Sequence, residues 1–157
     1  MSDYKKNYGN KNHQRPIPDK EVYKQKYVTV ENILKFEDLK EDLSDMIDEI
    51  SLYVKLKLRK DVITPTQIRN IYNRIVKIDG NVTKLQLLRP KLAFIAGKFG
   101  NDKYKREVID FFITIIKEVK EPSQVKHFKT FMEAVVAYHK YHHGDKDKYS
   151  MFQFLKF

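Results

Sequence analysis

Apolar residues recur at intervals of three and four along most of the chain, which is the spacing that gathers them on one face of an α-helix. The pattern covers five stretches, at about residues 36–59, 64–78, 83–99, 102–120 and 124–143. No stretch shows the strict alternation of a strand, and no repeat or nucleotide-binding glycine motif is present. The sequence therefore predicts an all-α protein, a compact bundle of about five helices.

The predicted helix boundaries rest on capping residues and on proline. Thr64, Pro65 and Gln67 form the pattern of a capping box, in which two side chains each satisfy a backbone N–H at a helix start. Ser123 is predicted to cap the last helix, directly after a proline that stops the preceding one. Pro90 falls inside the third helix, where it removes a backbone hydrogen bond and is predicted to kink or split the helix.

The two ends of the chain differ from this helical core. Residues 1–27 are rich in Lys, Asn and Gln without apolar periodicity, which indicates a flexible tail. This tail either orders on nucleic acid or a neighbouring subunit, or stays solvated. We therefore divide the chain into a disordered basic N-terminal tail over 1–30 and one helical domain over 31–157. The aromatic stretch Tyr149–Phe157 is predicted to fold back on the bundle, with packing on a partner as the alternative.

Charge narrows the choice of partner. The chain has 31 Lys and Arg against 21 Asp and Glu, a formal net charge of +10, which favours an anionic partner such as nucleic acid.

The chain contains no cysteine, so disulfides, thiolate metal sites and cysteine nucleophiles are excluded. No apolar run is long enough to span a bilayer, and the first residues lack a signal-peptide pattern. We expect a cytoplasmic protein with no membrane partner.

Basic residues gather in the second and third predicted helices. Arg69, Asn73 and Lys77 follow one another at intervals of four, opposite the apolar face. Lys84 forms a second stripe with Lys91 and Lys98 at intervals of seven, provided that the third helix continues past its proline. Such side chains bind phosphates and sugars without reading sequence. The candidate residues for binding nucleic acid are Arg69, Asn73, Lys77, Arg89, Lys91 and Lys98.

Aromatic residues interleave with these bases, and they allow two interpretations. Tyr72, Phe94 and Phe99 lie at helical spacing, so we expect them to belong to the core. The alternative is that they stack on the bases of a single strand, since aromatic rings between cations are typical of such sites.

Candidate chemistry is weak elsewhere. His139 and His143 have the spacing of four that can chelate a metal, but no acidic residue stands between them. They lie with His142 at a predicted helix C-terminus, where we expect an exposed basic end favoured by the helix dipole. No nucleophile, base and acid combine into a catalytic pattern. We therefore predict no metal, no cofactor and no enzymatic activity.

Three pieces of the chain together carry a family resemblance. These are TPTQIR at 64–69, LRPKLAFIAGK at 88–98 and FMEAVVAYHK at 131–140. In this order they resemble the small subunit of the type III-A CRISPR (Csm) effector complex, over about residues 36–143. Lys98 stands where the family often carries Arg, which keeps the charge but loses the bidentate fork. The stretch beyond Gly144 lies outside the resemblance.

The resemblance implies a non-catalytic, all-helical RNA-binding subunit that is present in several copies. The copies stack beside the guide-RNA filament and line the channel that holds target RNA. The implied partners are guide RNA, target RNA, the repeated backbone subunit, the large subunit and further copies of the chain itself. Two alternatives stay open from the residues: a DNA-binding regulator that uses the second and third helices as a helix-turn-helix, or a protein–protein spacer.

Overall fold

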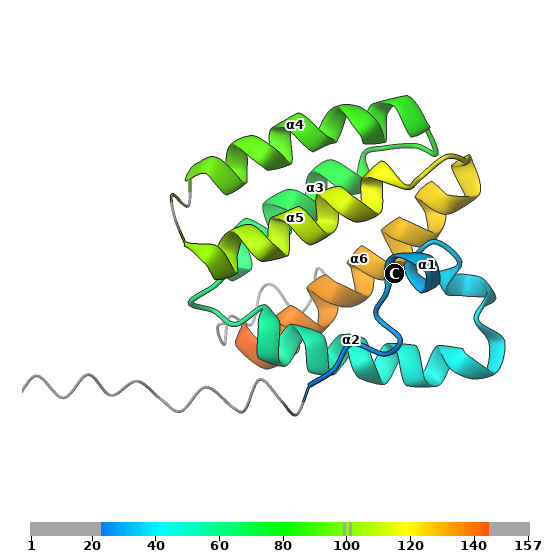
Figure 1. Ribbon diagram of the computed structural model, residues 1–157, viewed down its shortest axis with the longest axis horizontal. Helices are drawn as coiled ribbons and strands as arrows, with labels where there is room; N and C mark the ends of the chain where they lie inside the picture. Colours follow the sequence, from blue (N-terminus) through cyan, green and yellow to red (C-terminus); the bar gives the residue numbers. More distant parts are fainter. Residues whose placement is uncertain (1–22, 99, 101, 145–157) are drawn as a thin grey trace, which may run out of the picture.

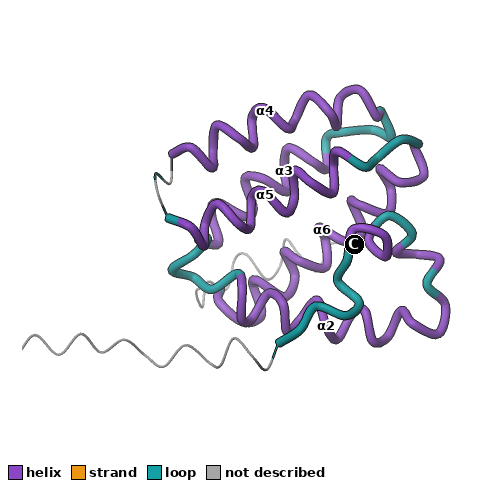
Figure 2. Tube along the Cα trace, in the orientation of Figure 1, coloured by secondary structure: helices purple, strands orange, loops and turns teal. Residues whose placement is uncertain are grey.

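The described residues, 23–98, 100 and 102–144 of a computed structural model, form helices joined by loops and contain no strand (Figure 2). The all-α prediction is therefore confirmed for this part of the chain. No helix within it is long and apolar enough to cross a membrane. The α-helices are α1 (Val30–Ile33), α2 (Leu43–Lys57), α3 (Pro65–Val76), α4 (Val82–Lys98), α5 (Lys103–Lys117) and α6 (Pro122–His143). Two 3-10 turns, η1 (Phe36–Asp38) and η2 (Lys40–Asp42), precede α2.

Helix α6, the longest, organises the bundle. It contacts α2 and α3 along its length and also touches α4, α1 and η1. Helix α5 packs mainly on α4. As a result α2 and α4 lie at opposite edges of the molecule, with α6 and α5 between them (Figure 1). This separation matters because the two edges carry different charges.

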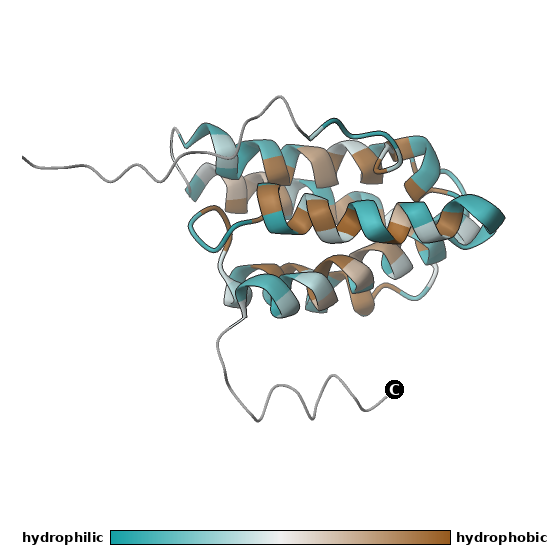
Figure 3. Cartoon of the chain, turned by 90° about the horizontal axis from the view of Figure 1, so that it is seen from below, coloured by the Kyte–Doolittle hydropathy of each residue, from teal (hydrophilic) through white to brown (hydrophobic). Residues whose placement is uncertain are grey.

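The core combines aromatic and aliphatic side chains. Phe112, Phe128 and Phe131 are fully buried, and the isoleucines of α3 belong to the same buried cluster. The long helices carry both apolar and polar residues, so their hydropathy changes from one side of the helix to the other (Figure 3). Burial of this apolar surface is the main force that holds the helices together.

Helix α3 begins as the sequence predicted. The Thr64 hydroxyl accepts the Gln67 N–H at 3.2 Å, and the Gln67 side-chain oxygen accepts the Thr64 N–H at 2.9 Å. Helix α6 begins two residues earlier than predicted, because Pro122 takes the first helical position and lacks the N–H that a cap would satisfy. Glu121, and not Ser123, is its cap residue.

Other boundaries differ more. Helix α4 runs unbroken through Pro90, so the predicted split does not occur. The first predicted helix begins later, at residue 43, because Lys40, the first residue of η2, has a φ of 51°, which an α-helix cannot contain. Helix α1 was not predicted; Thr29 caps it by accepting the Asn32 N–H at 3.2 Å.

The segment at 23–29, called here the N-terminal segment, packs on α2 (Figure 1). The Glu49 carboxylate accepts the backbone N–H groups of Lys26, at 2.6 Å, of Tyr27, at 2.5 Å, and of Val28. Val28 itself is buried. This part of the predicted tail is therefore attached to the bundle. The rest of the tail, residues 1–22, and the aromatic stretch 149–157 lie outside the described residues.

Candidate nucleic-acid interface

A basic groove runs between α3 and α4. Its volume is about 350 Å³. Four cationic side chains and three apolar ones line it, and no acidic side chain does. The lining residues are Arg74, Lys77, Ile78, Lys84, Leu87, Leu88 and Lys91.

Helical spacing explains how these cations converge. On α3 and directly after it, Ile71, Ile75 and Ile78 face the core, so Arg74 and the C-cap residue Lys77 fall along the side that adjoins α4. Helix α4 returns beside α3 after a tight turn in which Gly80 has a φ of 61°, a conformation that glycine adopts without strain.

The start of α4 sets the second wall of the groove. The Asn81 side-chain oxygen accepts the Lys84 N–H at 2.9 Å and so caps the helix. Lys84 and Lys91 are seven residues apart, about two helical turns, and therefore lie on the same side of α4. The lysine stripe that the sequence predicted across Pro90 exists here because the helix is continuous.

The charges of the basic groove are not neutralised within the described part of the protein. The side chains of Arg74, Lys77, Lys84 and Lys91 form no hydrogen bond or ion pair with other described residues. Four like charges around one hollow repel one another and produce a positive potential over it. An anion that entered the groove would relieve this repulsion.

The structure brings together only part of the predicted RNA-binding set. Lys77 and Lys91 line the groove, whereas Arg69 and Asn73 are exposed on α3 and do not line it. Two groove residues were missing from that set. Lys84 was signalled by its place in the lysine stripe, and Arg74 by its position next to the apolar face of α3.

Arg89 has a different environment from the other predicted cations. It is half-buried, and its Nη1 donates to the Gln86 side-chain oxygen at 3.2 Å. The Gln86 side-chain amide in turn donates to the carbonyl oxygens of Ile116, at 2.7 Å, and Val119, at 3.2 Å. Ile116 lies in the last turn of α5, and Val119 lies just after that helix. Arg89 is thus engaged in the packing of α4 against α5, and it does not line the groove.

The aromatic residues of this region divide between the two interpretations. Tyr72 is half-buried against the core, as expected. Phe94 is 67% exposed, so the expectation that it belongs to the core is wrong. Its ring lies under the ammonium group of Lys98, whose Nζ is 4.8 Å from the ring centroid. The Phe99 side chain lies outside the described residues.

The three histidines at the end of α6 hold that helix to its neighbours. His139 is 1% exposed, with its Nε2 3.1 Å from the Ile63 carbonyl oxygen, and His143 Nε2 is 3.1 Å from the Val54 carbonyl oxygen. His142 Nε2 is 2.8 Å from the Ser51 hydroxyl. The expected exposed basic helix end is therefore wrong, because these rings point inward.

Two rings of this histidine cluster (His139, His142 and His143) are held in the neutral form. Burial and the neighbouring His143 lower the pKa of His139 to about 4. Burial, His143 and Lys55 lower the pKa of His142 as well. Both rings are therefore neutral at physiological pH. Across the described residues, no three metal-ligating side chains of His, Cys, Asp or Glu come together.

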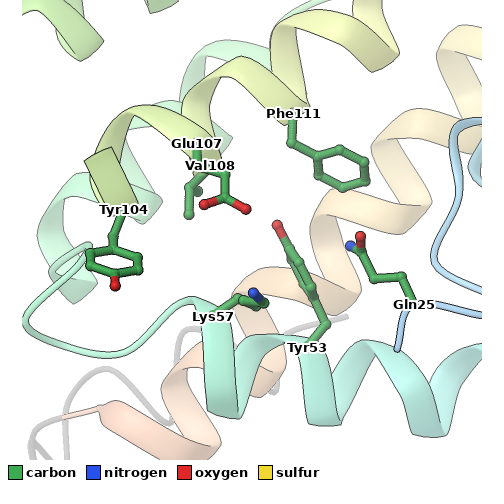
Figure 4. Close-up of a pocket in the computed structure, with 7 residues that line it drawn as sticks. All are labelled: Gln25, Tyr53, Lys57, Tyr104, Glu107, Val108 and Phe111. Carbon is green, nitrogen blue, oxygen red and sulfur yellow. The ribbon is translucent and has the colours of Figure 1, made fainter. Parts of the chain in front are cut away.

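A second hollow, of about 130 Å³, lies between α2 and α5 (Figure 4). Tyr53 and Lys57 reach it from α2, Glu107 from α5, and Gln25 from the N-terminal segment. Its volume is below the ~300 Å³ of the smallest typical ligand pockets. Burial raises the pKa of Tyr53, so its phenol stays protonated and cannot serve as a base near neutral pH. The hollow is a gap in the packing.

The fold and this site define a small helical protein that exposes a basic groove. A family model described as Csm2 Type III-A matches residues 54–145, which is more than half of the chain and includes the entire groove. The chain belongs to this family and is a small subunit of a type III-A CRISPR effector complex. Comparisons with curated proteins and with solved structures returned no match.

Proposed function

We propose that this subunit is a non-catalytic RNA-binding component of the type III-A effector complex, in which the basic groove holds the sugar-phosphate backbone of target RNA or of the guide–target duplex. The observation that carries this proposal is the groove itself, where Arg74, Lys77, Lys84 and Lys91 stand together with no acidic residue in the lining. Cations on flexible stems are typical phosphate contacts. Family membership supplies the RNA-guided context.

The groove is suited to backbone contact more than to sequence readout. Direct readout of base edges uses Asn, Gln or Arg in bidentate geometry. The outward face of α4 instead carries Leu87, Pro90 and Phe94. A helix-turn-helix regulator would need base-reading side chains on that face, so this alternative has little support. In RNA-guided systems base pairing with the guide supplies specificity, and the protein needs only to hold the strand.

The first candidate contacts are the four groove cations, and Arg69 and Asn73 extend them along the exposed side of α3. Lys98 lies on α4 beyond the groove, where it stays a predicted contact. Arg89 also stays a predicted contact, although one of its nitrogens is already engaged by Gln86.

The salt dependence of RNA binding by the full-length chain tests the groove. We expect Lys77→Ala and Lys91→Ala each to weaken binding of an unstructured single-stranded RNA to a similar degree whatever its sequence. Each variant should reduce the slope of log K against log salt by about 0.7, because one phosphate contact is lost. The measurement is a fluorescence-anisotropy titration at several salt concentrations.

Lys126→Ala is the matched control. Lys126 is an exposed lysine on α6 whose Nζ lies 3.5 Å from the Glu37 carboxylate, and it does not line the groove. The same change of charge there should leave the salt slope as in the wild type. An unchanged slope in Lys77→Ala and Lys91→Ala, or a loss confined to one RNA sequence, would contradict the proposal.

A further part of the proposal is that the subunit works in the cytoplasm among the other subunits of the complex, including the repeated backbone subunit, the large subunit and stacked copies of itself. Exposed acids on α2, among them Asp45 and Asp48, stand at the edge opposite the basic groove and give neighbouring subunits a different surface. If the chain were chiefly a protein spacer, the groove variants would prevent assembly before RNA binds. The mass of the complex purified without target RNA separates the two roles.

A further inference from the structure

The outer face of α4 exposes apolar residues that a helix bundle would normally bury. Phe94 is 67% exposed and Leu87, two turns earlier, is 62% exposed. Pro90, also exposed, stands between them. The remaining phenylalanines of the described helices are buried or half-buried. The fold alone therefore does not explain why the phenyl ring of Phe94 is exposed to water near a charged groove.

Lysines precede and follow Phe94 along α4. Lys98 places its Nζ 4.8 Å from the ring centroid, and Lys91, three residues before Phe94, also lines the basic groove. Three residues correspond to about 4.5 Å along a helix, so the ring stands one turn beyond the edge of the groove. Along α4 no acidic side chain occurs. The surroundings of the ring thus favour an anionic ligand with an apolar part.

We infer that Phe94 is a stacking platform for one unpaired base of the strand whose phosphates lie in the basic groove. The inference rests on the proposed function and adds the way in which the strand is held. The base would stack on the ring of Phe94, while Lys91 and Lys98 bind the phosphates on either side of it. Stacking on an aromatic face together with phosphate contacts is how many proteins bind single strands without reading their sequence.

An acidic protein partner is the other conceivable occupant of this face. The exposed strip is narrow, with Leu87 and Phe94 separated by two turns and lysines along one side. Leu87 also lines the groove, which joins the strip to the phosphate-binding surface. A nucleotide, which combines an anionic and a flat apolar part, matches both features at once. Protein docking is therefore an outcome that the test below has to distinguish.

The first experiment compares an ordinary RNA with one that lacks bases. The full-length chain is titrated with a short unstructured RNA of cytidine and adenosine, and with an abasic strand of the same length and charge. We expect Phe94→Ala to weaken binding of the ordinary RNA by about fivefold or more, as loss of one stacked base does. Phe94→Leu, which keeps apolar bulk without an aromatic face, should do nearly the same, while Phe94→Tyr should stay close to wild type. Binding of the abasic strand should not change in any of the three.

Tyr141 provides a matched control. It is an aromatic residue, 80% exposed, near the end of α6 and outside the groove. Tyr141→Leu should leave the affinity for both strands unchanged. The chain contains no tryptophan, so Phe94→Trp and Tyr141→Trp each introduce a single fluorescent reporter. Only the reporter at position 94 should be quenched when the base-containing RNA binds, because stacking brings a base into contact with the indole ring.

The outcomes separate this inference from the proposed function. Equal affinity of wild type and Phe94→Leu for the ordinary RNA, with a normal salt slope, would overturn the stacking platform and leave the groove proposal standing. Equal losses on the ordinary and abasic strands would also overturn it, because Phe94 would then act through the structure of α4. A change in solution mass of Phe94→Leu without a change in RNA affinity would assign the face to a protein partner. If the wild type bound neither strand, the proposed function itself would fail.

Discussion

The two edges of this protein use their polar side chains in opposite ways. One edge is formed by α2 and the C-terminal end of α6, which packs on it, and is called here the α2–α6 edge. Its polar groups are paired within the molecule. The histidine cluster holds α6 to α2 and to the loop at residue 63, and Glu49 holds the N-terminal segment. Along the α3–α4 edge, the four groove cations have no partner among the described residues. The charges differ as well. Residues 31–49 contain eight acids and two bases, whereas residues 69–98 contain seven bases and one acid.

This difference separates the groups that stabilise the fold from the groups available to a ligand. Removing a paired polar group leaves its partner unsatisfied and reduces stability. Removing an unpaired surface charge changes stability little, but it changes binding of anything the charge attracts. Stability and RNA affinity should therefore respond to different substitutions, and the predictions below test that separation from the largest expected effect to the smallest.

The largest effect should come from His139 through pH. Its pKa in the folded protein is about 4, against 6.5 without the fold, because the ring is buried beside His143. Between pH 4 and 6.5 the His139 ring is protonated in the unfolded chain and neutral in the folded protein. The stability due to His139 is therefore complete above pH 6.5 and is lost as the pH falls towards 4. The loss in unfolding free energy should reach about 3 kcal/mol. Urea unfolding at a series of pH values measures it.

The His139→Gln variant isolates this contribution. Glutamine can donate to the Ile63 carbonyl oxygen in place of Nε2 but does not titrate. The substitution leaves every other ionisable side chain in place, so the difference between the two pH profiles reports on His139. The variant should lose less stability than the wild type on acidification. Parallel pH profiles of the two proteins would show that His139 is not the group responsible.

The next effect should come from Glu49, which accepts three backbone N–H groups of the N-terminal segment. Glu49→Ala leaves these donors without their charged acceptor and should reduce the unfolding free energy by about 2–3 kcal/mol. Asp48→Ala is the control, since the Asp48 side chain is exposed and has no hydrogen bond or ion pair with described residues. RNA affinity should be the same in both variants. A loss of affinity in Glu49→Ala alone would mean that the two edges are coupled.

These edges were not equally predictable from sequence. Local patterns predicted α3 well, because Thr64, Pro65 and Gln67 interact with one another within a single turn. The lysine stripe was also predictable, because helix geometry fixes the positions of Lys84 and Lys91 once the helix continues through Pro90. What decides that continuity is packing of α4 on α5, which is not a local property.

Long-range contacts escaped sequence reasoning for the same reason. His139 faces a carbonyl 76 residues away, and Glu49 holds a segment more than 20 residues earlier in the chain. Neither partner is indicated by spacing. The exposure of Phe94 was missed because helical periodicity alone does not specify how wide the buried face of α4 is. Arg74 was overlooked for a similar reason, as its proximity to α4 depends on how the two helices pack.

A smaller effect should follow from removing the cap of α3. Thr64→Ala loses the hydroxyl that accepts the Gln67 N–H and should reduce the unfolding free energy by about 1 kcal/mol. Thr66→Ala, an exposed threonine two residues later, provides the control and should cost less. The measurement is again urea unfolding, with the midpoint compared at constant slope. Equal costs for the two substitutions would indicate that the capping box adds nothing to helix packing here.

The smallest effect on stability should come from the groove itself. The Lys84→Gln and Lys91→Gln double variant removes two of four clustered like charges, so it should change the unfolding free energy by less than about 0.5 kcal/mol, towards higher stability if mutual repulsion is relieved. The same protein should lose about 1.4 from the slope of log K against log salt for a single strand, because two phosphate contacts disappear. Adding salt should bring the stability of wild type and variant together, since screening weakens repulsion between exposed charges. A double variant that is clearly less stable than the wild type would mean that these lysines, like the residues of the α2–α6 edge, serve the fold, and the contrast between the two edges would no longer hold.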